Sequence, residues 1–417
     1  MELVVEGRYY RHGELRQGCI GIEEGRIVAL DRILKGEMHI DLGSRIILPG
    51  SIDPHVHFRD PGMTEKEDFL SGSTAALYAG VTTVLDMPNT KPPVKDREGL
   101  MDKKRVIRGR SFVDYGLFAA LTPGCDIPSM AAEVAGFKLF MGSTTGKILV
   151  DDDREIARLL PQVFNAGKVV SVHAEDESMM GSNVERDPMD HLRNRPLEGE
   201  LNAIRRLSPF RGQDVNICHV SSAQSMEMAH SLGFSTEVTA HHLFLHAGMV
   251  LGPRGKVNPP LREKKAQEDL LDAFMDGKAD MIGSDHAPHT LTDKEQEFHS
   301  CPSGIPGVGT TVPMLMAMVK RGHLSLGELV RMACENPAKR FGLKKGVIEV
   351  GYDADLVSFD GRRMREVDAK RLPGKSGWTP FQGREALFAD TIILGGELQL
   401  RKGELCGEPV GRDVFHA

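Results

Sequence analysis

Two histidines stand one residue apart, between an apolar run and an arginine. They lie in "DPHVHFRDPG", residues 53–62, directly after "RIILPGSI". Alternate residues of a strand point to the same side, so His55 and His57 can reach one point in space. A metal ion is the usual reason for this spacing, but two surface histidines after a turn explain it equally well. Only the rest of the sequence can separate the two interpretations.

Other residues with the chemistry of metal ligands accompany further strand-like runs along the chain. Each one alone has an ordinary explanation: a hydrogen-bonded core histidine, a lysine whose amine reaches solvent, or an aspartate that caps a helix. Their recurrence at equivalent positions favours one shared metal centre over a series of coincidences. The candidate ligands are His55, His57, Lys138, His173, His219 and Asp285.

The ligand types indicate which metal is bound and how many ions. Imidazole and carboxylate suit zinc, and manganese, cobalt or iron would also accept them. Four histidines and one aspartate exceed the needs of one catalytic zinc, yet they are too few for two ions without a bridge. A neutral lysine amine that reacts with CO2 becomes a carbamate, which can bridge two ions about 3.5–4 Å apart. The expected cofactors are therefore two Zn2+ ions and a CO2-derived carbamate on Lys138.

These residues need a scaffold that gathers the ends of strands. Between residues 51 and 344, short apolar runs alternate with amphipathic stretches such as "DDREIARLLPQVFNAG". With the strand before His55 they give about eight β–α units, the number in a (β/α)8 barrel, whose working residues come from the carboxyl ends of its strands. The runs are "GVTTVLDMP", "FVDYGLFAAL", "GFKLFMG", "GKVVSVHAE", "DVNICHVSS", "STEVTAHH" and "ADMIGSDHAPH".

Both ends of the chain have a different pattern. Short β-branched runs broken by glycine-containing turns fill residues 1–50 and return in residues 345–417. We therefore expect one small β domain, made from both termini, beside the barrel of residues 51–344. The predicted fold class is α/β, a TIM-type barrel with this small β domain.

Composition argues against several classes of protein. The 417 residues carry a net charge of -7 and no block rich in lysine or arginine, which argues against a nucleic-acid or membrane-surface partner. The six cysteines are scattered without paired spacing, as expected in a reducing compartment. The sequence shows no signal-peptide core and no apolar run near the ~20 residues of a membrane span. We expect a soluble, cytoplasmic protein.

Several motifs resemble those of dihydroorotases in the amidohydrolase superfamily, of the type found in the animal multifunctional pyrimidine enzyme. They are "DPHVHFRDPG", "DMPNTKPP", "ICHVSS", "SDHAPHT" and "SGWTPFQG". The resemblance also includes "EVTAHHLFL" and "GIPGVGT" and runs over nearly the whole chain. The arginine and aspartate after the paired histidines separate this type from allantoinase-like sequences, which carry "NEPG" there, and from dihydropyrimidinases.

The resemblance implies a role for each matching metal ligand. His55 and His57 would bind the more buried ion with Asp285, the other two histidines would bind the second ion, and carboxylated Lys138 would bridge them. Cys218 and Glu237 match positions that hold a third zinc in some relatives, but we favour simple packing of both residues at strand ends.

The resemblance also implies a set of substrate contacts. Arg59, Asn89 and His289 match positions that hold the substrate carboxylate, a task for which a fixed guanidinium is well suited. Asn258 and the backbone around Pro306 and Gly307 match ring contacts.

The implied reaction is the reversible cyclisation of N-carbamoyl-L-aspartate to L-dihydroorotate, a step of de novo pyrimidine (UMP) synthesis. A hydroxide that bridges the two ions attacks the ring carbonyl, while Asp285 serves as general base and then general acid. The partners are thus small-molecule substrates, and a homo-oligomer or an association with other pyrimidine enzymes stays open.

Two alternatives accompany this interpretation. One is another cyclic amidohydrolase, allantoinase or dihydropyrimidinase-like, against which Arg59 discriminates because those substrates lack the ring carboxylate. The other is a catalytically inactive scaffold relative without metal. The Gly/Ser/Thr-rich stretch 141–150 likewise has two interpretations, a plain loop and a lid that reaches the substrate through Thr144 or Thr145.

Overall fold

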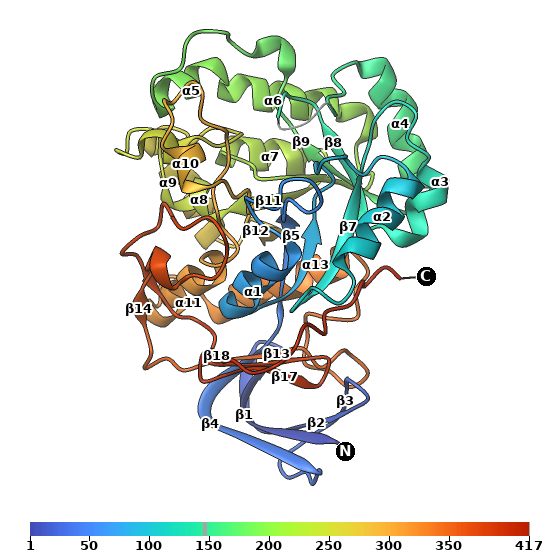
Figure 1. Ribbon diagram of the computed structural model, residues 1–417, viewed down its shortest axis with the longest axis vertical. Helices are drawn as coiled ribbons and strands as arrows, with labels where there is room; N and C mark the ends of the chain where they lie inside the picture. The colour runs from blue at the N-terminus through green and yellow to red at the C-terminus, as the bar shows by residue number, and fades with distance from the viewer. Residues whose placement is uncertain (145–147, 417) are drawn as a thin grey trace.

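A ring of parallel strands dominates the computed structural model, which describes residues 1–144 and 148–416 (Figure 1). The eight strands follow the order of the sequence, and a bridge between Val56 and His286 brings the last beside the first. They are β5 (Ser51–Val56), β6 (Val81–Asp86), β7 (Asp114–Ala120), β8 (Gly136–Phe140), β9 (Val169–His173), β10 (Val215–Ile217), β11 (Ser235–Thr239) and β12 (Met281–Gly283). The predicted (β/α)8 barrel is confirmed.

Helices connect the strands around the outside of the barrel (Figure 1). Local sequence sets their ends: Asp68 caps the start of α1 through a hydrogen bond from Ser71, and Gly80 ends it at a φ of 88°. No helix in the described part of the chain is long and apolar enough to cross a membrane. The helices are α1 (Phe69–Ala79), α2 (Arg97–Ile107), α3 (Ile127–Met130), α4 (Asp153–Asn165), α5 (Pro188–Asn194), α6 (Leu197–Arg206), α7 (Ala223–Ser231), α8 (Ala240–Phe244), α9 (Lys264–Met275), α10 (Leu291–Lys294), α11 (Thr311–Arg321), α12 (Leu326–Val330) and α13 (Asn336–Arg340).

A second sheet of eight strands lies below the barrel in Figure 1 and combines both ends of the chain. Its central strand, β4, pairs in parallel with β1 and antiparallel with β13, so an early strand and a late strand meet there. The N-terminal strands are β1 (Leu3–Arg11), β2 (Glu14–Glu23), β3 (Arg26–Asp31) and β4 (Met38–Pro49). The C-terminal strands are β13 (Leu356–Phe359), β16 (Thr391–Leu394), β17 (Glu397–Arg401) and β18 (Glu404–Leu405). The predicted β structure from both termini is therefore present.

The backbone is strained where several barrel strands end. Arg59, His219 and Asp285 have φ values of 60°, 38° and 42°, in the left-handed region that L side chains rarely adopt. Each such residue costs on the order of 1–3 kcal/mol, and residues of this kind gather at functional sites. All three follow strand carboxyl ends and belong to the predicted site.

Candidate metal centre

The carboxyl ends of the barrel strands enclose a buried pocket that contains all six predicted metal ligands. Three of the predicted substrate contacts, Arg59, Asn89 and Asn258, also line it. The remaining lining residues are Phe140, Thr144, Val257, Ala287, Ser303 and Gly304. Residues as far apart in the sequence as His55 and Asp285 thus meet because parallel strands bring their ends to one side of the barrel.

His55, His57 and Asp285 converge at the junction between the first and the last barrel strand. Asp285 Oδ1 lies 3.1 Å from His57 Nε2 and 3.4 Å from His55 Nε2. One ligand atom of each residue lies within 4.8 Å of the others, and all three side chains are buried. The backbone supports this arrangement, since His57 N donates to the carbonyl of His286 at 2.8 Å.

The outer nitrogens of these two imidazoles have their own partners. His57 Nδ1 lies 2.6 Å from Asn89 Oδ1, and His55 Nδ1 lies 2.8 Å from Glu237 Oε1. An amide oxygen only accepts, so His57 donates through Nδ1 and leaves the lone pair on Nε2. That lone pair faces an oxygen of Asp285, so two hydrogen-bond acceptors lie opposite each other and repel. A cation bound between them removes this repulsion. The residues therefore fit a metal ion.

His173 and His219 form the second group of candidate ligands. His173 Nδ1 lies 3.1 Å from His219 Nε2, while His173 Nε2 lies 2.8 Å from Glu175 Oε2. The carboxylate accepts the Nε2 proton and leaves Nδ1 of His173 as an acceptor toward the centre of the pocket. The ring of His219 also lies beside that of His55, with centroids 5.3 Å apart, so the two groups adjoin.

Lys138 lines the same pocket as the two histidine groups and is 1% exposed. Its amine donates to Cys218 Sγ at 2.9 Å. Cys218 and Glu237 also form a group with His55 in which the ligand atoms lie within 4.8 Å of one another. Burial raises the pKa of Cys218 to about 12 and that of Glu237 to about 8, so both are predominantly protonated at neutral pH. Packing of the two residues, which we expect, stays a prediction.

Burial lowers the pKa of three of the candidate histidine ligands. It lowers the pKa of His55 to about 3 and that of His57 to about 4, and it holds the pKa of His219 well below its usual range. Neutral imidazole is the form that ligates a metal. Burial opposes ionisation of Asp285, but the neighbouring His55 and His57 outweigh it and keep its pKa well below the ordinary value. At neutral pH His55, His57 and His219 are therefore neutral imidazoles, and Asp285 is a carboxylate.

Arg59 brings a fixed positive charge to the pocket at 3% exposure. Its Nε donates to the carbonyl of Pro288 at 3.3 Å, and Nη2 lies 3.4 Å from His289 Nε2. Burial lowers the pKa of Arg59 to about 10, so the side chain stays charged at neutral pH. In the described residues no carboxylate forms an ion pair with Arg59, and its charge is available to an anionic ligand.

The other predicted substrate contacts do not line this pocket. His289 contacts Arg59 but lies outside the pocket lining, with Lys66 Nζ 3.1 Å from Nδ1. Pro306 lines a neighbouring cavity instead. Gly307 lies against β12, where an added Cβ would come within 2.6 Å of the Ser284 carbonyl oxygen. Their contact with the ring of a substrate stays a prediction.

Sequence reasoning missed several residues of this site. Ser303 and Gly304 line the pocket from the loop in which Pro306 and Gly307 were expected to do so. Glu175 and Arg195, which support His173, were also missed, although Glu175 follows that histidine by two positions in "VHAED". Of the stretch 141–150, Thr144 lines the pocket, whereas Thr145 lies outside the described residues.

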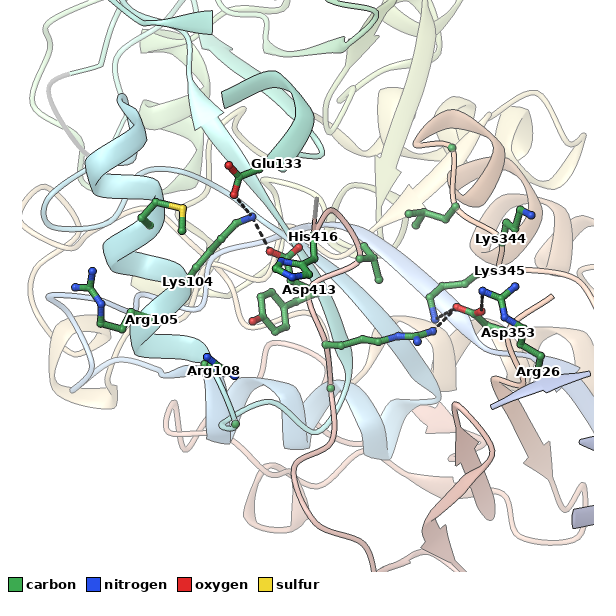
Figure 2. A pocket seen from close by; sticks show the side chains of 18 residues that line it. Arg26, Lys104, Arg105, Arg108, Glu133, Lys344, Lys345, Asp353, Asp413 and His416 are labelled. Atoms are coloured by element: carbon green, nitrogen blue, oxygen red, sulfur yellow. Dashed lines mark hydrogen bonds and ion pairs between the residues drawn. The ribbon is translucent and has the colours of Figure 1, made fainter. Parts of the chain in front are cut away.

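A larger cleft, of about 980 Å³, lies at the opposite end of the barrel, near the start of β7 (Figure 2). Lys104 there forms ion pairs with Glu133 at 3.3 Å and Asp413 at 2.8 Å. Arg412 pairs with Asp353 at 2.7 Å. These ion pairs fasten the C-terminal segment to the barrel, and no predicted site residue lines the cleft, so we assign the chemistry to the smaller pocket.

Comparison with known proteins agrees with the geometry. The Amidohydrolase family matches residues 46–391. A dihydroorotase of Methanosarcina acetivorans is 34% identical over 98% of this chain and 93% of the relative, and a dihydroorotase of Thermoplasma acidophilum is 36% identical over 99% and 97%. A dihydroorotase of Pyrococcus furiosus is 35% identical over 99% and 96%.

Solved structures of related enzymes share the whole architecture. The L-hydantoinase (dihydropyrimidinase) of Arthrobacter aurescens superposes with a TM-score of 0.92 at 27% identity, covering 99% of this chain and 98% of that one. A D-hydantoinase from Thermus sp. gives a TM-score of 0.89 at 26% identity, covering 99% of this chain and 100% of that one. The match of the family over most of the chain and the full-length relatives agree, and the chain belongs to the amidohydrolase family.

Proposed function

We propose that the protein is a dihydroorotase, which interconverts N-carbamoyl-L-aspartate and L-dihydroorotate in de novo pyrimidine synthesis. The observation that carries this proposal is Arg59, a buried guanidinium in the pocket that also holds the candidate metal ligands. Dihydroorotate bears a ring carboxylate that this charge can bind, whereas hydantoins and dihydropyrimidines lack one. The relatives that match over the full length are named dihydroorotases.

The candidate ligands would hold two divalent ions, for which zinc is the best match to the imidazole-rich set. We assign His55, His57 and Asp285 to one ion, His173 and His219 to the other, and a carbamate on Lys138 to both. When bound, the ions supply Lewis acidity and a water nucleophile at neutral pH.

We assign the orientation of the substrate to Arg59 and Asn89. Because His57 occupies Asn89 Oδ1, the amide group of Asn89 has its NH2 left to donate to the substrate carboxylate. A charged guanidinium and an amide donor together fix one end of the ring, so the amide carbonyl is presented to the metal ligands. We assign Asn258 to contact with the ring, because it lines the pocket and its Oδ1 is held 2.8 Å from His191 Nε2.

Proton transfer falls to Asp285, whose carboxylate is ionised and lies at the end of the barrel beside the imidazoles. In the hydrolytic direction it accepts a proton from the attacking water and delivers it to the ring nitrogen as the C–N bond breaks. In the synthetic direction the same two transfers run in reverse. Ring closure consumes one proton overall, so lower pH favours dihydroorotate.

A substrate comparison tests the proposal. Purified protein is assayed with dihydroorotate, allantoin and dihydrouracil, with and without added zinc. Turnover of dihydroorotate far above the other two is expected. Preference for an uncharged cyclic amide would make it a hydantoinase-type enzyme, like its structural neighbours, and absence of both metal and turnover would make it an inactive scaffold.

All six cysteines are free, which supports our proposal of a cytoplasmic location.

A further inference from the structure

Two buried arginine–glutamate pairs lie directly behind the histidines that we assign to the second ion. The first pair contains Glu175, two residues after His173, and Arg195, which follows α5. The second contains Glu200 in α6 and Arg262 in the loop before α9. Neither pair is needed for the substrate contacts or the proton transfer described above, so their role requires a separate explanation.

Glu175 binds the imidazole of His173 on the side that faces away from the pocket. The distance from Glu175 Oε2 to His173 Nε2 is 2.8 Å, and each residue is 3% exposed. The carboxylate can only accept, so the imidazole proton stays on Nε2 and Nδ1 keeps its lone pair. A ligand histidine whose proton is fixed by a carboxylate is oriented and made more basic.

Arg195 binds the carboxylate of Glu175 in a bidentate contact. Its Nε lies 3.1 Å from Oε1, and its Nη2 lies 2.6 Å from Oε2. A planar guanidinium holds a carboxylate in one orientation, which a lysine ammonium does not. The orientation of the imidazole is therefore set by Arg195 through Glu175.

The second pair extends the support to the strand that carries His219. Arg262 Nε donates to Ser221 Oγ at 2.7 Å, and Ser221 N donates to Glu200 Oε1 at 2.9 Å. Ser221 lies two residues after His219, beyond the strained backbone of that histidine. Arg262 Nη1 also donates to the carbonyl of Arg195 at 2.7 Å, which joins the two pairs into one network.

The same network reaches the loop that follows β8. Arg195 Nη2 donates to the carbonyl of Ser143 at 2.9 Å. Ser143 N donates to Glu177 Oε2 at 2.6 Å, so the loop is held from both sides. The next residue, Thr144, lines the pocket. Arg195 therefore contacts both the support of a candidate ligand and the wall of the site.

We propose that Glu175 and Arg195 are positioning residues that hold His173 Nδ1 ready for the second ion. This inference rests on the two-ion centre proposed above. Loss of Arg195 frees Glu175 to turn, so His173 loses its fixed proton and orientation and the second ion is held less tightly. The first ion keeps His55, His57 and Asp285 and is unaffected. A second-ion affinity lower by about 10- to 100-fold is expected, the usual effect of removing an outer partner of a ligand.

Metal binding distinguishes this role from that of an ordinary buried ion pair. The variants are Arg195→Met, Arg195→Lys and Glu175→Gln, with Arg45→Met as the matched control. Arg45 of β4 forms a partly buried pair with Asp390 at 2.8 Å in the second sheet, and neither residue lines the pocket. Zinc affinity and stoichiometry are measured by equilibrium dialysis, and anomalous diffraction at the zinc edge shows which position is emptied.

Native protein and Arg45→Met should bind two ions alike, although the control unfolds at a lower temperature. Arg195→Met should retain the first ion and bind the second about 10- to 100-fold more weakly, with Arg195→Lys in between. Unchanged affinity for both ions in Arg195→Met and Glu175→Gln, or equal weakening of both ions, would overturn the proposal. If native protein bound only one ion, the two-ion centre itself would be wrong.

Discussion

Arg59 has two features that a buried cation rarely combines: a left-handed backbone and a side chain without a carboxylate partner in the described chain. Among the described residues, its side chain forms polar contacts with the carbonyl of Pro288 and the ring of His289. A buried charge of this kind is costly unless a ligand neutralises it. At the scale of single residues, we therefore expect the specificity of the site to depend chiefly on this guanidinium.

Replacing that guanidinium should remove activity and leave the metals bound. A charge-assisted contact is worth roughly 1.5–3 kcal/mol, about one to two decades in rate, so Arg59→Met should lower kcat/KM for dihydroorotate by at least that factor. Steady-state kinetics with metal analysis measure both effects. Arg108→Met, an exposed arginine near the other end of the barrel, is the control. Near-normal kinetics in Arg59→Met would contradict the carboxylate assignment.

Asp285→Asn separates ligation from proton transfer. The amide keeps an oxygen for the metal but cannot carry a proton at neutral pH. We expect turnover to fall by about 10²–10⁴-fold in both directions, while zinc analysis still finds metal. Substantial remaining turnover would remove Asp285 as the proton carrier.

Lys138→Ala tests the carbamate. The variant should lose activity and at least one ion, because Asp285 would be the only carboxylate left in the proposed ligand set. The missing stem leaves room for a small acid, so acetate or propionate should restore part of the activity. Intact-mass measurement of the native protein under mild conditions tests the modification directly. A bare amine in active, metal-loaded protein would contradict it.

The elements that carry these residues were largely predictable. Each of the seven apolar runs contains one barrel strand, because β-branched runs bounded by glycine are distinctive in a sequence. His55 and His57 were predictable as a pair because a strand places alternate residues on one side. The supporting contacts were not, since Glu237 lies 182 residues from His55 and only folding brings them together. Ser303 and Gly304 line the pocket without a recognisable sequence signal, while the predicted contact of nearby Pro306 with the substrate ring stays a prediction.

At the scale of elements, Glu185 ties the segment before α5 to the loop that carries Lys256. Its carboxylate lies 2.8 Å from His191 Nδ1 and 2.9 Å from Lys256 Nζ. Burial opposes ionisation, but the hydrogen bonds from His191 and Lys256 lower the pKa of Glu185 from 4.5 to about 2. The ionised form therefore stabilises the folded state.

This pKa shift predicts an acid-dependent stability. The unfolded chain takes up the proton near pH 4.5 and the folded protein only near pH 2, so the contribution is complete above pH 4.5 and is lost as the pH falls to about 2. The difference in unfolding free energy between native protein and Glu185→Gln should shrink over that range. Urea denaturation across the acid range measures it, with Glu268→Gln, in an exposed pair with Lys264, as the control. A difference independent of pH would contradict the assignment.

At the scale of the whole molecule, the C-terminal segment binds to the end of the barrel that lies opposite the pocket. Val414 N donates to the carbonyl of Tyr115, and Tyr115 N donates to that of Arg412, both at 2.9 Å. Gly411 N donates to the carbonyl of Ser111 at 2.8 Å. The segment thus extends along β7 and closes one side of the cleft shown in Figure 2.

Deleting residues 410–417 should destabilise the protein without changing its chemistry. Three backbone hydrogen bonds at about 1 kcal/mol each give a loss of about 3 kcal/mol. Thermal unfolding should show the lower stability, and kcat/KM for dihydroorotate should stay at the native value because the pocket lies at the other end of the barrel. A truncated protein with native stability would show that these contacts contribute nothing.

The shared sheet also sets an order of events during synthesis on the ribosome. Leu356 of β13 pairs with Pro49 of β4, a partner made 307 residues earlier. At about 5–20 residues per second, that interval lasts roughly 15 to 60 s. Throughout it, the apolar edge of β4, with Ile46, Ile47 and Leu48, has no strand on that side. We therefore expect the nascent N-terminal strands to need temporary protection of this edge until β13 has emerged.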